Sequence, residues 1–547
     1  MGEVFRAKDT KLGRDVAIKV LPAAAQTFTP RTFVAQAILS ARLMPDGQTM
    51  IISSALTGNA PALFEARPGT AAPHPFGPPR THLLSISKTG ELAVLTDAAY
   101  IAQRLFRGTL ARMSVDGAPR AIAEDVREAD WLPDGSELVV VRETRGGDQL
   151  EFPIGHVVYK VAGYLSDPRV SPDGTHVAFM EHPVKFDNRG YVKVVDRTGT
   201  VTTVAGEFPA EEGVAWSADG RSVLFAAAST DAVDTNVYRT AAVGGGKPLP
   251  LIASAGSLYL QDMASDGRMA VTREDSRLGV VARGAAQDTE RDLTPLDQAW
   301  QPALSADGRF VMFGDGHGGR DYALMLRNVD GSPPAQLGDG NPGDVSKDGR
   351  WVTATLYSSG RCVVYPTGAG AVVPIEMGPL EACQRAIWFP DGKNLLVTGN
   401  EPGKPARAYR AAFPGGKPEA LLPEGLFALG ISKNGLRVLA QDTSRVFQLF
   451  EVGGAASSVK GLLPGDAFVE WGPDERTVVV ADTSSIPAQI YQVGLDTGKR
   501  AKLAELAPAD RAGLTSVVPS AYRDGGRQYA YSYVRRVSTL YLVNAAK

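Results

Sequence analysis

The sequence contains only two cysteines in 547 residues, no long hydrophobic run and almost no excess charge of either sign. Two cysteines exclude a scaffold that is held together by several disulfides. No apolar run approaches the 18 residues that a membrane-spanning helix needs, so we expect no membrane span. The 57 Lys and Arg residues against 60 Asp and Glu residues give a formal net charge of −3. This balance argues against nucleic acid as a partner and against a polybasic contact with a membrane.

The two cysteines, Cys362 and Cys383, have no His or Cys near them at the spacing of a metal site. We therefore interpret them as a pair of buried, inert thiols. The first 25 residues do not resemble a signal peptide, because Lys19 interrupts the short apolar stretch and acidic residues precede it. With neither an export signal nor a membrane span, a cytoplasmic location is expected.

What the sequence has in abundance is turn residues, with 59 glycines and 37 prolines. A tetrapeptide of the type Ser-Pro-Asp-Gly recurs about every 43 residues and predicts a repeat protein. The third position of the twelve copies is Asp46, Thr89, Asp134, Asp173, Asp219, Asp266, Asp307, Asp348, Asp391, Asn434, Asp474 and Asp524.

Each copy has the chemistry of a tight hairpin turn. Pro presets φ at the second position, Asp can accept bonds from nearby backbone N–H groups, and Gly tolerates a positive φ at the end. The residue three positions before each Asp is apolar in all twelve copies, and four of the six Trp residues fall in this column. Alternating apolar residues, such as Val177 and Phe179, follow the turn and predict a strand with one buried face.

Four short strands in about 43 residues make the blade of a β-propeller. The sequence therefore predicts an all-β protein of twelve blades. Two six-bladed propellers in tandem, at residues 31–295 and 296–547, are the simplest division, although the spacing alone leaves seven plus five open. We expect a monomer.

These repeats resemble the WD40-like propeller repeats of the TolB family and the propeller domains of prolyl-oligopeptidase-type peptidases. The resemblance covers about residues 31–545 and is specific for the fold but not for the function. A peptidase of this type would also need a Gly-x-Ser-x-Gly elbow on a hydrolase domain, and no such pentapeptide occurs.

Residues 1–22 form a separate segment, followed by a linker at residues 23–30. They resemble the start of a bacterial Ser/Thr protein kinase. Gly2 and Val4 match the end of the Gly-rich loop, and Lys19 in Val-Ala-Ile-Lys matches the ATP-binding lysine. The catalytic loop and the Asp-Phe-Gly motif are absent, so the resemblance implies a vestigial ATP site and no phosphoryl transfer. We expect no cofactor.

Two further patterns in the first half of the chain are candidate binding sites. His176 and His182, with Glu181 and Asp187, have no recognised metal-ligand spacing and would lie about 20 Å apart on an extended strand. We therefore expect no metal site. The stretch 145–166 departs most from the rhythm of the blades, as an insertion at a binding mouth would.

This stretch carries residues that are common at interfaces. We expect a protein or peptide partner to bind there, at the mouth of a propeller, although packing between blades is the alternative explanation. The candidate contact residues are Glu151, His156, Tyr159 and Tyr164.

The function that fits these observations is a non-catalytic binding or scaffold protein, derived from the carboxy-terminal part of a receptor-like bacterial Ser/Thr kinase. One alternative is a fragment of a kinase whose catalytic domain is missing from this chain. Another is a TolB-like accessory protein of the cell envelope.

Ring closure poses a separate problem, because only two strands, at about 527–534 and 538–544, follow the last turn. The last blade then lacks an outer strand, and an open edge invites aggregation. We expect residues 31–37 to supply that strand.

Overall fold

The computed structural model of the chain describes residues 27–544, apart from residues 35, 57, 59, 71, 103, 145, 186, 230–233, 255 and 320, and the backbone of residues 3–9 and 14–20. In this part of the chain nearly all regular structure is β-strand, with two short 3₁₀ helices, η1 (Gly316–Gly318) and η2 (Asp524–Gly526). No described helix is long or apolar enough to cross a membrane.

The repeated turns have the predicted chemistry. In the fourth copy the Ser171 hydroxyl donates to Asp173 Oδ1 at 2.5 Å, and the backbone N–H of Thr175 donates to the same oxygen at 3.0 Å. These bonds, the one from Ser171 foremost, lower the pKa of Asp173 to about 2. Gly174 takes a φ of +74°, which a residue with a Cβ adopts only with strain. None of the twelve apolar residues before the turns is exposed.

The described strands form twelve antiparallel blades in two rings of six, as the repeats predict. The inner strands of the first ring contact one another in order, and the sixth contacts the first. One long strand, β11, is the outer strand of the second blade and the inner strand of the third. The strands of the first ring are β4 (Ala37–Leu43), β5 (Met50–Ala55), β6 (Ala62–Ala66) and β7 (His74–Phe76); β8 (His82–Ile86), β9 (Leu92–Ala102), β10 (Leu105–Met113) and β11 (Arg120–Trp131); β12 (Leu138–Thr144), β13 (Gly147–Glu151) and β14 (Val157–Val161); β15 (Tyr164–Val170), β16 (His176–His182), β17 (Gly190–Asp196) and β18 (Val201–Phe208); β19 (Glu211–Trp216), β20 (Ser222–Ala228), β21 (Thr235–Ala241) and β22 (Leu249–Ile252); and, in the sixth blade, β23 (Ser257–Met263), parts of β24 (Met269–Arg283) and β47 (Gln528–Val543), and β3 (Phe28–Pro30).

The second ring is built in the same way, and its sixth blade again contacts its first. Its strands are β26 (Ala299–Leu304), β27 (Phe310–Asp315), β28 (Ala323–Asn328) and β29 (Ala335–Asp339); β30 (Asn341–Val345), β31 (Trp351–Leu356), β32 (Arg361–Pro366) and β33 (Val373–Pro374); β34 (Ala382–Trp388), β35 (Asn394–Asn400), β36 (Arg407–Ala412) and β37 (Glu419–Ala420); β38 (Leu426–Ile431), β39 (Arg437–Asp442), β40 (Phe447–Glu451) and β41 (Ala456–Ser458); β42 (Asp466–Trp471), β43 (Thr477–Asp482), β44 (Ala488–Gly494) and β45 (Arg500–Leu506); and, in the sixth blade, β46 (Leu514–Arg523), the remaining parts of β47 and β24, and β25 (Arg291–Asp292).

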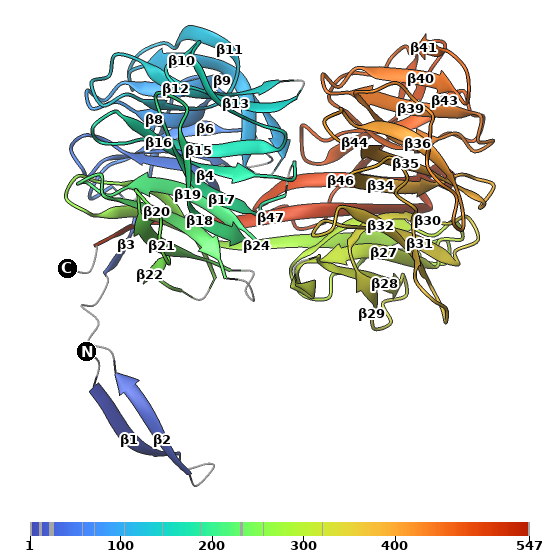
Figure 1. Cartoon of the computed structure of the whole chain (residues 1–547), viewed down its shortest axis with the longest axis horizontal. Helices are drawn as coiled ribbons and strands as arrows, with labels where there is room; N and C mark the ends of the chain where they lie inside the picture. The colour runs from blue at the N-terminus through green and yellow to red at the C-terminus, as the bar shows by residue number, and fades with distance from the viewer. Residues whose placement is uncertain are drawn as a thin grey trace.

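The two rings share strands β24 and β47, which run from one ring into the other (Figure 1). The two strands pair without a register shift from Met269 opposite Val543 to Arg283 opposite Tyr529. The order in the first ring is β23-β24-β47-β3, and the order in the second is β46-β47-β24-β25. Each ring is thus completed by strand segments that continue from the other ring.

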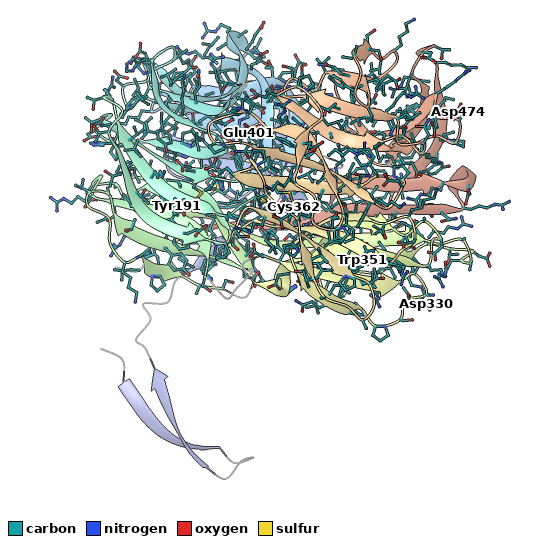
Figure 2. The ribbon with its side chains drawn as sticks, turned by 45° about the vertical axis from the view of Figure 1, so that its right-hand side comes forward. Tyr191, Asp330, Trp351, Cys362, Glu401 and Asp474 are labelled. Carbon is teal, nitrogen blue, oxygen red and sulfur yellow. A yellow bond between two sulfur atoms is a disulfide. The ribbon has the colours of Figure 1, made fainter. Side chains whose placement is uncertain are left out.

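This exchange fixes how the rings face each other. We call the paired part of β24 and β47 between the rings the crossing ribbon. In both sixth blades it takes the place of the loop between the second and third strands. The ring faces that carry these loops in the other blades therefore point toward one another. Contacts between the rings agree: Tyr322 donates to Asp187 Oδ2 at 2.7 Å, and the N–H of Gly58 donates to the Leu514 carbonyl at 3.2 Å. The Ser-Pro-Asp-Gly turns lie on the opposite faces, and Figure 2 places Asp474 at the side of the second ring away from the first.

The closure predicted for the last blade is wrong in its details. The last two strands predicted from the sequence are one strand, β47, and the second ring is closed by β24 and β25. The early segment does lie beside β47, but it completes the sixth blade of the first ring. Phe28–Pro30 pairs with Val543 to Tyr541, and Arg31 and Thr32 continue the contact through bonds of 2.7 Å and 2.9 Å to Leu540.

Removal of residues 1–36 is therefore expected to lower the melting temperature by at least about 3 °C, because β3 and its continuation along β47 are lost. Removal of residues 1–26 deletes none of these bonds and serves as the control. Differential scanning calorimetry of the two shortened chains makes the comparison, and equal melting temperatures would contradict this role of the segment.

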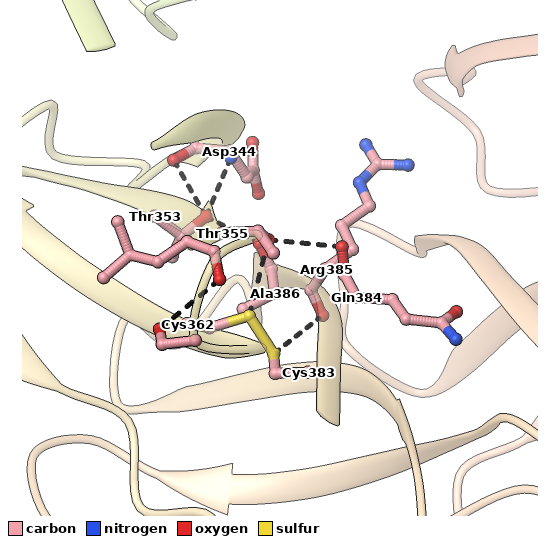
Figure 3. The surroundings of a disulfide bond; sticks show 10 residues. Asp344, Thr353, Thr355, Cys362, Cys383, Gln384, Arg385 and Ala386 are labelled. Carbon is pink, nitrogen blue, oxygen red and sulfur yellow. Dashed lines mark hydrogen bonds between the residues drawn. A yellow bond between two sulfur atoms is a disulfide. The ribbon is translucent and has the colours of Figure 1, made fainter. Parts of the chain in front are cut away.

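The two cysteines form a disulfide, so their interpretation as free thiols is wrong (Figure 3). Cys362 lies on the third strand of one blade, and Cys383 lies on the inner strand of the next blade of the second ring. Their Cα atoms are 5.7 Å apart, and both side chains are buried. The bond joins neighbouring blades, whose proximity cannot be read from a spacing of 21 residues.

Candidate binding site in the first ring

The stretch 145–166 is not an insertion. It holds β13 and β14, the regular outer hairpin of the third blade, and the first residues of β15. Glu151 is buried, and its carboxylate accepts bonds from Gln149 Nε2 at 2.9 Å and from the Gly155 N–H at 2.8 Å. His156 is exposed. Of the predicted contact residues, Glu151 is therefore already bound within its own blade.

The two tyrosines of this stretch lie apart from each other. Tyr159 is half-buried on the outer strand, where it donates to Glu181 and accepts from Lys193 Nζ at 3.1 Å. Tyr164 begins the inner strand of the next blade and is 2% exposed. The four candidate residues thus occupy different environments and do not make one surface, but Tyr164 lines a cavity in the channel of the first ring.

Of the kinase-like residues, Gly2 lies outside the described residues. The backbone of Val4 and Lys19 is paired in the hairpin of β1 (Glu3–Asp9) and β2 (Arg14–Val20). Their side chains are outside the described part of the chain. The vestigial ATP site therefore stays a prediction.

Bulges in three inner strands of the first ring place charged side chains at its channel. The pairing register shifts between Val126 and Glu128 in β11, and the same kind of shift occurs in β15 and β19. A bulge adds an unpaired residue and redirects the side chains beside it. Asp167 and Glu212 sit at the shifts of β15 and β19, and Asp167 takes a φ of +51°.

The channel of the first ring contains a cavity of about 60 Å³, which all six blades line. This is far below the ~300–1,000 Å³ of sites for drug-sized ligands. The space suits a small polar group. The charged and hydrogen-bonding residues that line it include Ser40, Arg104, Glu128, Asp167, Glu211 and Glu212.

Arg104 reaches this cavity from the connection between β9 and β10. Its guanidinium pairs with Glu212, lies 2.7 Å from Glu274 Oε2 and donates to the Ile38 carbonyl at 3.0 Å. It also stacks over the ring of Tyr259 at 4.2 Å. The two carboxylates offset the cost of its burial and raise the pKa of Arg104 well above its ordinary value. Arg104 is thus a fixed cation shared by two acids.

Glu211 is a fully buried acid of this cavity that has no counter-ion among the described residues. It is 0% exposed, and neither carboxylate oxygen has a hydrogen-bond partner among the described residues. Burial, together with the nearby charges of Asp167 and Glu181, raises the pKa of Glu211 well above its usual value. A buried polar group without a partner is costly, so it points to a missing ligand or water.

One wall of the cavity is aromatic and uncharged. The rings of Tyr164 and His182 stack with centroids 4.1 Å apart and planes 9° apart. Ser166 Oγ lies 3.0 Å from His182 Nε2, and Tyr164 donates to the Asp187 carbonyl at 2.9 Å. Burial lowers the pKa of His182 to about 4, so the ring is neutral near pH 7. No group of His, Cys, Asp and Glu in the described chain is arranged to hold a metal ion.

The buried acids predict that the first ring loses stability as the pH rises from 6.5 to 8. Burial raises the pKa of Glu128 to about 8 and that of Asp130 to about 7. An acid with a raised pKa keeps its proton in the folded state, so the free energy of unfolding falls as the pH rises toward that pKa. His182 has the opposite sign, but its contribution changes only below about pH 6.5.

Urea unfolding of the whole chain at pH 6.5 and pH 8.0 measures this effect. The midpoint is expected to fall at the higher pH, and to fall less in Glu128→Gln. The same change with pH in both proteins would show that Glu128 is not responsible.

No protein-family model matches the chain, and no curated protein sequence matches it. Solved structures with a similar fold include the GH74 enzyme of Niastella koreensis, at 11% identity and a TM-score of 0.34 over 90% of each chain. The tricorn protease has 13% identity and a TM-score of 0.33 over 91% of this chain and 60% of that one. TolB from Acinetobacter baumannii has 13% identity and a TM-score of 0.23 over 66% of this chain and 65% of that one.

This chain spans less than two thirds of the length of the last two proteins. At such identities the likeness concerns the β-propeller fold alone. The comparisons do not test the kinase resemblance of residues 2–22, which stays a prediction.

Proposed function

We propose that this chain is a non-catalytic binding protein whose ligand site is the channel cavity of the first ring. The observation that carries the proposal is the carboxylate of Glu211, which is buried against the cavity without a partner. A binding site is where such an unsatisfied group is expected, because a ligand can complete its hydrogen bonds.

The stacking of the rings limits what can reach this site. The loop-bearing face of the first ring points toward the second ring, so a globular domain cannot dock flat on it. The side chains of Arg104 and Glu212 keep exposures of 13% and 15%, which leaves the mouth open to solvent. A small molecule or the end of a peptide fits these constraints. The proposed ligand is therefore smaller than the folded protein partner that the sequence leaves open.

Two serines provide a matched test of the location. Ser40 and Ser85 are both buried on inner strands, and neither hydroxyl has a hydrogen-bond partner among the described residues. Of the two, only Ser40 lines the cavity. Short peptides selected by phage display against the whole chain are expected to bind Ser40→Val at least tenfold more weakly than wild type. Ser85→Val is expected to bind as wild type does. Equal binding to wild type and Ser40→Val would place the site elsewhere.

The absence of catalysis is part of the proposal. Phosphoryl transfer needs a catalytic Asp and metal-binding side chains in addition to a lysine such as Lys19. We expect no incorporation of labelled phosphate from ATP into a general protein substrate. Incorporation that disappears in Lys19→Met would contradict this.

The disulfide favours a second candidate, an accessory protein of the cell envelope in the manner of TolB. Stable disulfides are typical of oxidising compartments and rare in the cytosol. The Cys362–Cys383 bond therefore supports a location outside the cytoplasm over the cytoplasmic one expected from the sequence. Alkylation of thiols at the moment of cell lysis tests this: two unmodified cysteines support the envelope, and two alkylated cysteines support the cytoplasm.

A further inference from the structure

We propose that the cavity of the first ring binds a primary ammonium group, either the end of a lysine side chain or the amino terminus of a peptide. This inference rests on the proposed function, because it names the chemistry of the ligand for the same site. It follows from the charges around the cavity, from its size and from its aromatic wall.

More acidic than basic side chains line the cavity. Arg104 is already shared by Glu212 and Glu274. The other lining cation, Arg42, donates to the carbonyls of Leu84 and Ala41 at 3.0 Å and 2.9 Å. The remaining acids have no ion pair within the described part of the chain; they are Glu128, Asp167 and Glu211.

The arrangement suits an ammonium better than other cations. The described acids are not arranged around a metal ion. An ammonium is a compact charge with three hydrogen-bond donors, whereas a guanidinium is a wide planar fork. A cavity of about 60 Å³ takes the smaller group. Tyr164 and Tyr259 line the same cavity, and the Tyr259 ring already has the Arg104 guanidinium over it at 4.2 Å, so this wall tolerates a cation.

Binding is expected to release a proton. Burial raises the pKa of Glu211, so this carboxyl keeps its proton in the empty site to a higher pH than an exposed glutamate does. A bound ammonium favours the ionised carboxylate, which then gives up its proton. Affinity should therefore increase from pH 6 to pH 8, because the proton of the carboxyl competes with the ammonium for the same oxygens.

The test uses the whole chain and n-butylammonium as the probe, with n-butanol as its neutral counterpart. Isothermal titration calorimetry in two buffers of different ionisation enthalpy measures both affinity and proton release. We expect butylammonium to bind with release of a proton, and butanol not to bind. Glycinamide and Nα-acetyl-lysinamide then distinguish an amino terminus from a lysine side chain.

Glu211→Gln is expected to weaken butylammonium binding at least tenfold, while the exposed Glu419→Gln leaves it unchanged. Equal binding of butanol, or an unchanged affinity in Glu211→Gln, would overturn the inference. If Glu211→Gln does not fold, the wild-type affinity decides, and an affinity that does not increase from pH 6 to pH 8 overturns it.

The two proposals fail in different ways. If the selected peptides depend on Ser40 but butylammonium does not bind, the ammonium is not the ligand group, although the location of the site is supported. Peptide binding that is indifferent to Ser40 would overturn the site itself.

Discussion

Neither half of this chain is expected to fold when it is expressed alone. Residues 27–295 lack β47, so the sixth blade of the first ring keeps only β23, β24 and an unpaired β3. Residues 296–547 lack β24 and β25, so the sixth blade of the second ring keeps only β46 and β47. Both halves would expose long strand edges, which favour aggregation over a folded monomer.

Co-expression of the two halves is the matched control for this prediction. Together they contain every strand of both rings, so we expect a soluble complex that elutes in gel filtration close to the volume of the intact chain. Circular dichroism and limited proteolysis of each half alone complete the comparison. A half that is monomeric, resistant to protease and cooperative in its unfolding would contradict the sharing of strands.

Loss of the disulfide is expected to destabilise the second ring by about 3 kcal/mol, the usual effect of opening a loop of this size. The bond closes a loop between residues 21 positions apart and joins two blades. Trp351 and Trp388 pack in the same cluster as Cys362 and Cys383, so tryptophan fluorescence reports on this region. The double variant Cys362→Ala with Cys383→Ala should unfold at a lower urea concentration than wild type.

A reducing agent provides the control for the disulfide. Reduction should lower the midpoint of the wild type toward that of the double variant and leave the variant itself unchanged. A wild type with two titratable thiols before reduction, or a midpoint that reduction does not move, would contradict the bond.

The blades could be predicted from the sequence because their signals are local. The turn at Asp173 needs only Ser171, Gly174 and Thr175, and the apolar residue that precedes each turn marks the inner strand. Twelve copies of such a signal predict the fold without any long-range information. The same count makes six and six blades the simplest division, although the spacing leaves seven plus five open.

The connections between rings could not be predicted, because they pair residues 246 to 274 positions apart. Met269 opposite Val543 leaves no local pattern. The length of the last segment is the one available hint, but its sequence predicts two strands, at about 527–534 and 538–544, where the structure has β47 alone. The proximity of Cys362 to Cys383 was hidden for the same reason, since it depends on how adjacent blades pack.

The candidate site was missed although its sequence carried a signal. Inner strands of a propeller are largely apolar, and β11 and β19 break this pattern with Arg127-Glu128 and Glu211-Glu212. The sequence instead favours the stretch 145–166 as the binding surface. Of its four candidate residues, Tyr164 alone lines the cavity. Charged residues in a strand that should be buried therefore indicate the site better than a departure from the rhythm of the blades does.

Hydrogen exchange across the crossing ribbon tests most directly the central claim that the two rings form one interlocked unit. Amides of residues 274–279 and 533–538, which span the passage between the rings, are paired in one continuous ladder. Mass spectrometry of the intact chain should find them protected to the same degree as the central strands of the blades. Exchange at the rate of an unstructured linker would contradict the claim.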